Sequence, residues 1–282
     1  MTAVLTIAGY GFREAVRRKV FAVVLVLTAL FLSLLSLACH FVFRHVESVP
    51  PPIPGVSPRA YAGAFMLGLG MFGTLFLGIV LAIFLTLGAV RGDAERGLLQ
   101  PLVVRPIGRS TFLLARFFGA AGVAAIYVLA IYGIGLAIID LTGSWLPANV
   151  AAPGIELAGA VVIVVAISLL GSVVLSSTEN GIAVFMLFGA GLVSGLLGSI
   201  GQALDSSTIE RISTITAWAL PFEALYQDAL GLISSDATTS FLLKLGPFGG
   251  GFVHGWDVRV WAVGYLVAAL GAATFLFSRR DL

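Results

Sequence analysis

Six long apolar segments, separated by polar or proline-containing stretches, follow one another along the chain. Each has about 20 or more mainly apolar residues, the length that an α-helix needs to cross a hydrocarbon core roughly 30 Å thick. These segments cover residues 20–43, 61–90, 117–139, 157–177, 181–203 and 258–278. The pattern predicts an all-α integral membrane protein with six transmembrane helices. The second segment is long enough to tilt in the bilayer or to project into the cytoplasm.

An amphipathic pattern precedes the first apolar segment. Between residues 4 and 16, apolar residues that include Phe12 recur at spacings of three and four, while Arg13 lies on another face of the expected helix. Arg17 and Arg18 directly follow this segment. This spacing is typical of a helix that lies along the surface of the inner leaflet. The alternative is that these residues form the solvated start of the first span.

Composition supports membrane burial of most of the chain. Hydrophobic residues make up 59% and charged residues 11% of the 282 residues, whereas soluble domains are about 25% charged. We expect a single transmembrane domain over residues 1–282, with lipids as neighbours and no nucleic acid as partner. With the amino terminus inside, 11 of the 16 Lys and Arg residues fall on the inner side, which predicts a plasma-membrane or inner-membrane protein with both termini cytoplasmic.

The residues that ion-driven transport or catalysis requires are missing from the pattern. No charged residue lies near the middle of a predicted span, so a buried proton relay is not expected. Lys19 and Lys244 are followed by Val20 and Leu245, not by the Ser or Thr of a phosphate-binding loop. We therefore expect no enzyme activity and no cofactor on this chain, with ATP and Mg²⁺ bound by a separate subunit.

The histidine spacing also argues against a metal site. Cys39, His40 and His45 are close in sequence, but the two histidines are five residues apart and so lie on different faces of a helix. We expect these to be unpaired residues near the membrane interface, and we expect no bound metal.

The connection between the second and third spans is the best candidate for contact with that subunit. It is rich in arginine, yet it also carries apolar residues that a purely solvated loop seldom has. The predicted contact residues are Asp93, Glu95, Arg96, Gly97, Leu98, Leu99, Gln100, Arg105, Pro106 and Arg109. The alternative is that the arginines only bind anionic lipid headgroups.

This loop resembles a signature of ABC-2 type permeases, the transmembrane subunits of ABC exporters. In both, an acidic residue and a Gly are followed, in this order, by a hydrophobic pair, Arg-Pro, a further Arg and an apolar helix. The matching positions are Glu95, Gly97, Leu98, Leu99, Arg105, Pro106, Arg109 and Phe112. The resemblance implies that residues 93–109, the coupling loop, dock into the ATP-binding subunit.

Other segments are also similar to this family. The amino-terminal amphipathic segment, with Phe12, Arg13, Arg17 and Arg18, resembles its elbow helix, and the ending FLFSRRDL resembles its usual carboxyl terminus. PFEALYQDAL, from Pro221 to Leu230, resembles its short extracellular helices before the last span. The family's assembly of two permeases and two ATP-binding subunits implies a second permease copy or homologue as partner.

Two features outside the loop have more than one interpretation. Pro221, Phe222 and Glu223 lie where an extracellular gate is possible, although a solvated interfacial helix would explain Glu223 and Asp228 equally well. Gly191, Gly195 and Ser199 place small residues at every fourth position of the fifth span. Such a stripe allows close helix packing, either within one chain or between two copies.

Together these patterns favour a permease subunit of an ATP-driven exporter that moves an amphiphilic or hydrophobic solute outward by alternating access. The alternatives are a permease-like subunit for metal-centre or envelope-enzyme maturation, and a membrane scaffold that transports nothing.

Overall fold

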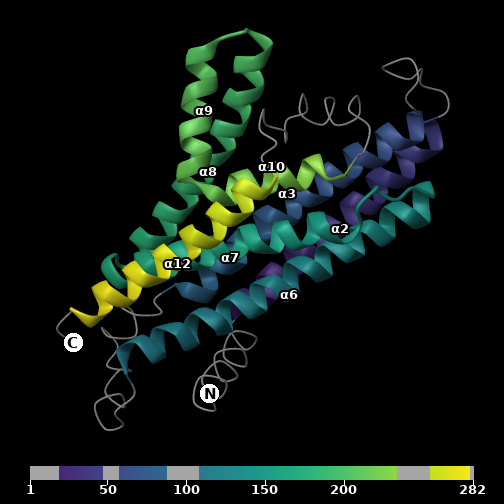
Figure 1. The fold of residues 1–282 in the computed structure, drawn as a ribbon. Helices are drawn as coiled ribbons and strands as arrows, with labels where there is room; N and C mark the ends of the chain where they lie inside the picture. The colour runs from purple at the N-terminus through teal and green to yellow at the C-terminus, as the bar shows by residue number, and fades with distance from the viewer. Residues whose placement is uncertain (1–18, 47–56, 88–107, 234–254, 280–282) are drawn as a thin grey trace.

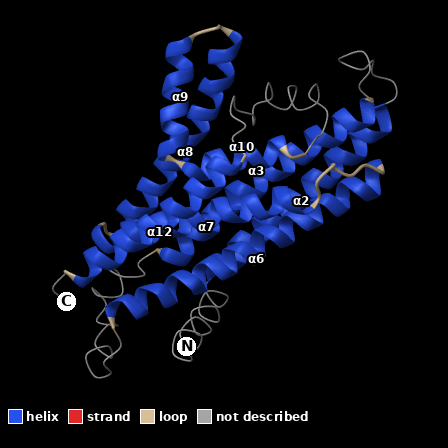
Figure 2. Ribbon diagram, in the orientation of Figure 1, coloured by secondary structure: helices blue, strands red, loops and turns tan. Residues whose placement is uncertain are grey.

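The computed structural model describes residues 19–46, 57–87, 108–233 and 255–279, and within these ranges the chain is helical with no strand (Figure 2). Six of its helices are long and apolar enough to cross a membrane. They are α2 (Lys19–His45), α3 (Pro58–Thr86), α6 (Arg109–Gly143), α7 (Ala151–Val174), α8 (Ser177–Ala203) and α12 (Trp256–Ser278). The prediction of an all-α membrane protein with six spans is therefore confirmed. The predicted elbow helix lies outside the described residues.

The spans differ from the apolar segments chiefly at their ends. The longest is α6, with 35 residues, because the helix starts at Arg109 and extends through polar residues on both sides of the predicted 117–139. Likewise α7 begins at Ala151 and so includes Glu156, which the pattern placed just before its span. Backbone hydrogen bonding continues a helix past the end of its apolar run, and apolar length alone does not show this.

The centre of the bundle is formed by α3 and α7, the spans with the largest buried fraction, whereas α2 and α12 are the most peripheral. Close approach occurs at Gly78 of α3, where an added Cβ would lie 2.8 Å from Val128 of α6 and 2.9 Å from Val161 of α7. Small residues at such crossings let helix backbones pack closely in a lipid environment. α3 is thus held between α6 and α7.

The chain between the fifth and last spans forms two shorter helices, α9 (Ser207–Ala219) and α10 (Pro221–Gly231). The sequence pattern indicates a short helix here only at residues 221–230, so α9 is an additional helix that the pattern does not indicate. Pro221 ends α9 and occupies the first turn of α10, where its missing N–H costs no helical hydrogen bond.

The α8–α9 pair rises away from the other helices, at the top of Figure 1. Reciprocal hydrogen bonds join its two arms, since the Ser194 hydroxyl donates to Ser213 O at 3.0 Å and the Ser213 hydroxyl donates to Ser194 O at 2.6 Å. α10 then returns to the bundle and packs against α7 and α12.

The bundle has two ends, at which different helices begin and end (Figure 1). At one, the Arg109 end, α3 ends, α6 begins and α12 ends. At the other, the Glu156 end, α7 and α12 begin and α10 lies beside them.

Candidate functional site

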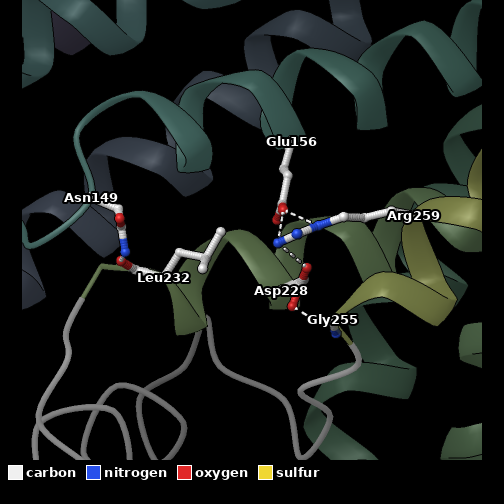
Figure 3. A network of polar contacts seen from close by, with 6 residues as sticks. All are labelled: Asn149, Glu156, Asp228, Leu232, Gly255 and Arg259. Atoms are coloured by element: carbon white, nitrogen blue, oxygen red, sulfur yellow. Dashed lines mark hydrogen bonds and ion pairs between the residues drawn. The ribbon is translucent and has the colours of Figure 1, made fainter.

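Three charged side chains from three helices meet at the Glu156 end (Figure 3). Arg259 of α12 donates from Nε to Glu156 Oε1 of α7 at 2.7 Å, and its Nη2 lies 2.6 Å from the same oxygen. Nη2 also lies 3.1 Å from Asp228 Oδ2 of α10. The guanidinium therefore links α7, α10 and α12.

Burial makes this cluster unusual for a membrane protein. Glu156 and Asp228 are 7% and 2% exposed, whereas the Arg259 side chain keeps about a third of its surface, 32%. Glu156 Oε2 is fully buried and has no hydrogen-bond partner among the described residues. Ionisable side chains at such positions are costly and mark functional sites by default.

The cluster also anchors the loops around it. Asp228 Oδ1 accepts a hydrogen bond from the Gly255 N–H at 3.1 Å, at the start of α12. Nearby, the Asn149 amide donates to Leu232 O at 3.3 Å and so joins the α6–α7 connection to the end of α10 (Figure 3). Main-chain groups at the start of α12 and at the end of α10 thus hold Asp228 and Asn149 in place.

The sequence pattern did not bring this cluster together. The predicted spans begin at residues 157 and 258, so Glu156 and Arg259 were expected at span ends, where a side chain can reach water, but Glu156 is buried. The solvated-helix interpretation of Glu223 and Asp228 is likewise wrong, because both are 2% exposed. A usable signal was present, since the three partners lie near the ends of elements that the predicted topology places on one side of the membrane.

A third buried carboxyl belongs to Glu223 of α10. Its Oε1 accepts a hydrogen bond from Gln227 Nε2 at 2.7 Å, one turn further along the helix, while Oε2 has no hydrogen-bond partner among the described residues. Burial raises the pKa of Glu223 to about 7, although the Gln227 hydrogen bond opposes that shift. Burial, with the neighbouring Glu223 charge, also raises the pKa of Tyr226.

The small-residue stripe of α8 lies against this part of α10. A Cβ at Gly191 would fall 3.0 Å from the Phe222 ring, and one at Gly195 would fall 2.8 Å from Glu223 Oε1. These two glycines therefore pack against α10 of the same chain. Ser199 is partly buried further along α8. Pro221, Phe222 and Glu223, the predicted gate residues, are all buried at this junction.

At the Arg109 end, one of the predicted contact residues of the coupling loop, Arg109, is described. Arg109 Nη1 donates to Ser278 O at 3.1 Å and to Phe277 O at 3.5 Å, so it satisfies carbonyls at the last turn of α12. The Phe112 and Phe277 rings lie 6.4 Å apart between the same helices. The start of α6 and the end of α12 are thus joined.

A buried polar network joins the end of α3 to α7 and α8. The hydroxyls of Thr86 and Ser168 are 2.6 Å apart, and Asn180 Nδ2 donates to Ser168 O at 2.9 Å and to Ser168 Oγ at 3.3 Å. The three side chains are at most 1% exposed. Thr86 is the last residue of α3, immediately before the segment that leads to the coupling loop.

Most predicted contact residues lie outside the part of the chain that the structure describes. These are Asp93, Glu95, Arg96, Gly97, Leu98, Leu99, Gln100, Arg105 and Pro106 in the loop, and Phe12, Arg13, Arg17 and Arg18 in the amino-terminal segment. Within the described ranges, no group of three or more His, Cys, Asp or Glu side chains is placed to hold a metal ion.

These features define a class of protein: a multi-pass helical membrane protein with a helical hairpin and a short buried helix inserted before its last span. The family model described as ABC-2 family transporter protein matches residues 5–282, and the chain belongs to this family. It is a transmembrane permease domain of an ABC transporter, a kind of subunit that partners in general with an ATP-binding subunit and is generally not catalytic itself. A search of curated proteins returned no match.

Proposed function

We propose that this chain is the transmembrane subunit of an exporter that moves an amphiphilic or hydrophobic solute outward by alternating access, energised by a separate ATP-binding subunit. In this proposal the Arg109 end is cytoplasmic, in agreement with the arginine distribution. The coupling loop docks into the partner subunit, and residues 221–223 form part of an outer gate.

The observation that carries the proposal is that the helices on both sides of the coupling loop, α3 and α6, are tied to other helices near the loop. On one side, Thr86 bonds to Ser168, which also bonds to Asn180. On the other side, Arg109 bonds to the end of α12. A displacement of the loop would thus be passed to α7, α8 and α12. At the opposite end, α7 and α12 carry Glu156 and Arg259, which are paired with each other.

A pair of permease chains is part of the same proposal. Apart from its contacts with α9, α8 contacts the other spans sparingly, and the hairpin exposes large apolar residues such as Met186, Val193 and Ile215. A second copy would bury part of this surface. Cross-linking of a Met186→Cys variant in a Cys39→Ser background tests it; only monomer would contradict the pair.

The direct test combines the chain with a candidate ATP-binding subunit. In inside-out vesicles, we expect added ATP to drive accumulation of a fluorescent amphiphile, and we expect the permease to stimulate ATP hydrolysis. Glu95→Ala and Arg105→Ala should abolish both effects while the complex still forms.

The matched control is Arg211→Ala, an exposed arginine on α9. It should leave hydrolysis and accumulation unchanged. Stimulation that survives Glu95→Ala and Arg105→Ala in an intact complex would contradict the coupling assignment. Accumulation that needs no ATP would contradict the energy source.

A further inference from the structure

A cavity of about 410 Å³ lies between α7, α10 and α12 at the Glu156 end. Glu156 and Arg259 line it at one point, and the rest of its wall is apolar, with Gly159, Ile163, Leu225 and Leu266 among the lining residues. We call this cavity the α7–α12 groove.

The groove opens toward the outside of the bundle. Two of its lining residues, Ile155 of α7 and Val263 of α12, are 63% and 62% exposed, so its rim lies on the surface that faces lipid. From Glu156 to Ile163, seven residues of helix give it a length of about 10 Å. That is about a third of the hydrocarbon core. An alkyl chain suits this groove, because the wall offers hardly any polar partner beyond Glu156 and Arg259.

The charge at one point of the groove decides which headgroup suits it. Two buried carboxylates, Glu156 and Asp228, share the single guanidinium of Arg259 within the described residues. Glu156 Oε2 is buried, lacks a hydrogen-bond partner among these residues and belongs to a side chain that lines the groove. A buried charge without compensation is costly, and a cation supplied by a ligand would reduce that cost.

We propose that the α7–α12 groove binds a single-chain amphiphile with a cationic amine headgroup, the chain lying along the apolar wall and the amine beside Glu156, whose partner Arg259 also faces the buried Asp228. As the solute class of the exporter, this inference rests on the proposed function; as a binding site, it stands without it. An anionic amphiphile would meet the surplus negative charge and bind less well.

The test uses the purified full chain in nanodiscs of zwitterionic lipid at pH 8, with no ATP and no partner subunit. The probes are a photoactivatable alkylamine and a photoactivatable alkyl sulfate of the same chain length. We expect the amine to label peptides of α7 and α12 about tenfold more than the sulfate at equal concentration, which corresponds to about 1.4 kcal/mol. An excess of unlabelled amine should compete.

Two variants separate charge from shape. Glu156→Gln/Asp228→Asn changes the cluster from surplus negative to surplus positive, so the sulfate should now label the groove more than the amine. Gly159→Leu should prevent labelling by both probes, because a Cβ there meets only Leu225, at 3.6 Å, and a larger side chain extends into the groove. Gly264→Leu is the control, since no atom lies within 4 Å of a Cβ at Gly264.

Equal or stronger labelling of the wild-type groove by the sulfate would overturn the proposal. So would labelling that Gly159→Leu leaves intact, or an amine preference that persists in a folded double variant. If the double variant does not fold, the probe comparison and Gly159→Leu decide alone. Because the assay contains no ATP, failed vesicle transport would count against the proposed function and not against this site.

Discussion

Gly195 of α8 lies directly against the Glu223 carboxyl of α10. A Cβ at Gly195 would fall 2.8 Å from Glu223 Oε1 and 3.1 Å from Gln227 Nε2, and these two atoms are already hydrogen-bonded to each other. The glycine thus leaves the space that a buried polar pair occupies. The absent Cβ allows α10 to approach the fifth span closely at this point.

Replacement of Gly195 should therefore separate α8 from α10. For Gly195→Leu we expect a loss of about 1–3 kcal/mol in the free energy of unfolding, the usual cost of overpacking. Thermal unfolding of the detergent-purified protein measures it. Gly189→Leu is the matched control, because nothing lies within 4 Å of a Cβ at that position of the same helix. Equal midpoints for the two variants would show that α8 and α10 do not pack as described.

The stability of the protein should depend on the protonation of Glu223. The pKa of this carboxyl is about 7 in the folded protein, compared with an ordinary value of 4.5. Between these values the folded state binds the extra proton, so the free energy of unfolding should fall as pH rises from about 4.5 to about 7 and level off above. The total loss is about 3 kcal/mol for a pKa difference of this size.

Glu223→Gln should remove that dependence, because the amide keeps the shape of a protonated carboxyl and carries no charge. We expect its thermal midpoint to exceed that of the wild type at pH 8 and to match it near pH 5. Asp140→Asn, at an exposed position, should keep the wild-type profile. A Glu223→Gln profile that still falls with pH would assign the titration to another group.

The number and type of the spans could be predicted from sequence because apolar length is a strong and local signal. The buried charges could not, since their pairing depends on how helices distant in sequence meet. Glu156 and Arg259 are 103 residues apart, and each looks like an ordinary interfacial residue when its own segment is considered alone.

The helix α9 escaped prediction for a related reason. Its sequence from Ser207 to Ala219 is rich in Ser and Thr, which do not favour helix interiors. In the structure these hydroxyls have partners, as when Thr214 and Thr216 donate to carbonyls one turn earlier and Ser213 donates to α8. Tertiary packing on α8 thus overrides a weak local preference.

The polar network at the Arg109 end should behave as one unit. Thr86→Val removes the hydroxyl that bonds to Ser168, and Asn180→Ala removes the amide that bonds to the same residue. Each change should cost about 1–2 kcal/mol, since it leaves buried polar atoms without partners. The double variant should lose less than the sum, by about 0.5 kcal/mol or more, because the two changes share Ser168.

Unfolding of the four proteins in this cycle measures the coupling. Thr74→Val serves as the comparison, since the Thr74 hydroxyl donates to Gly70 O of its own helix at 2.7 Å. Thr74→Val and Asn180→Ala should therefore be additive. Strict additivity of Thr86→Val and Asn180→Ala would mean that α3 and α8 are not joined through Ser168, and the proposed path from the coupling loop would lose that link.

The last prediction concerns the contact between α9 and α12. Trp261 Nε1 donates to Trp218 O, near the end of α9, at 2.8 Å, and the two indole rings lie 5.9 Å apart in an edge-to-face arrangement. Trp261→Phe keeps an aromatic ring but removes the donor, at a cost of about 1 kcal/mol. Since 1.4 kcal/mol corresponds to a tenfold change in an equilibrium constant, we expect amide hydrogen exchange in α9 to rise about fivefold.

Tyr265 supplies the control for this prediction, because its ring centroid lies 6.2 Å from that of Trp261. Tyr265→Phe keeps the ring contact, so exchange in α9 should not change. Faster exchange in both variants, or in neither, would mean that the Trp261 hydrogen bond does not hold α9 against the last span.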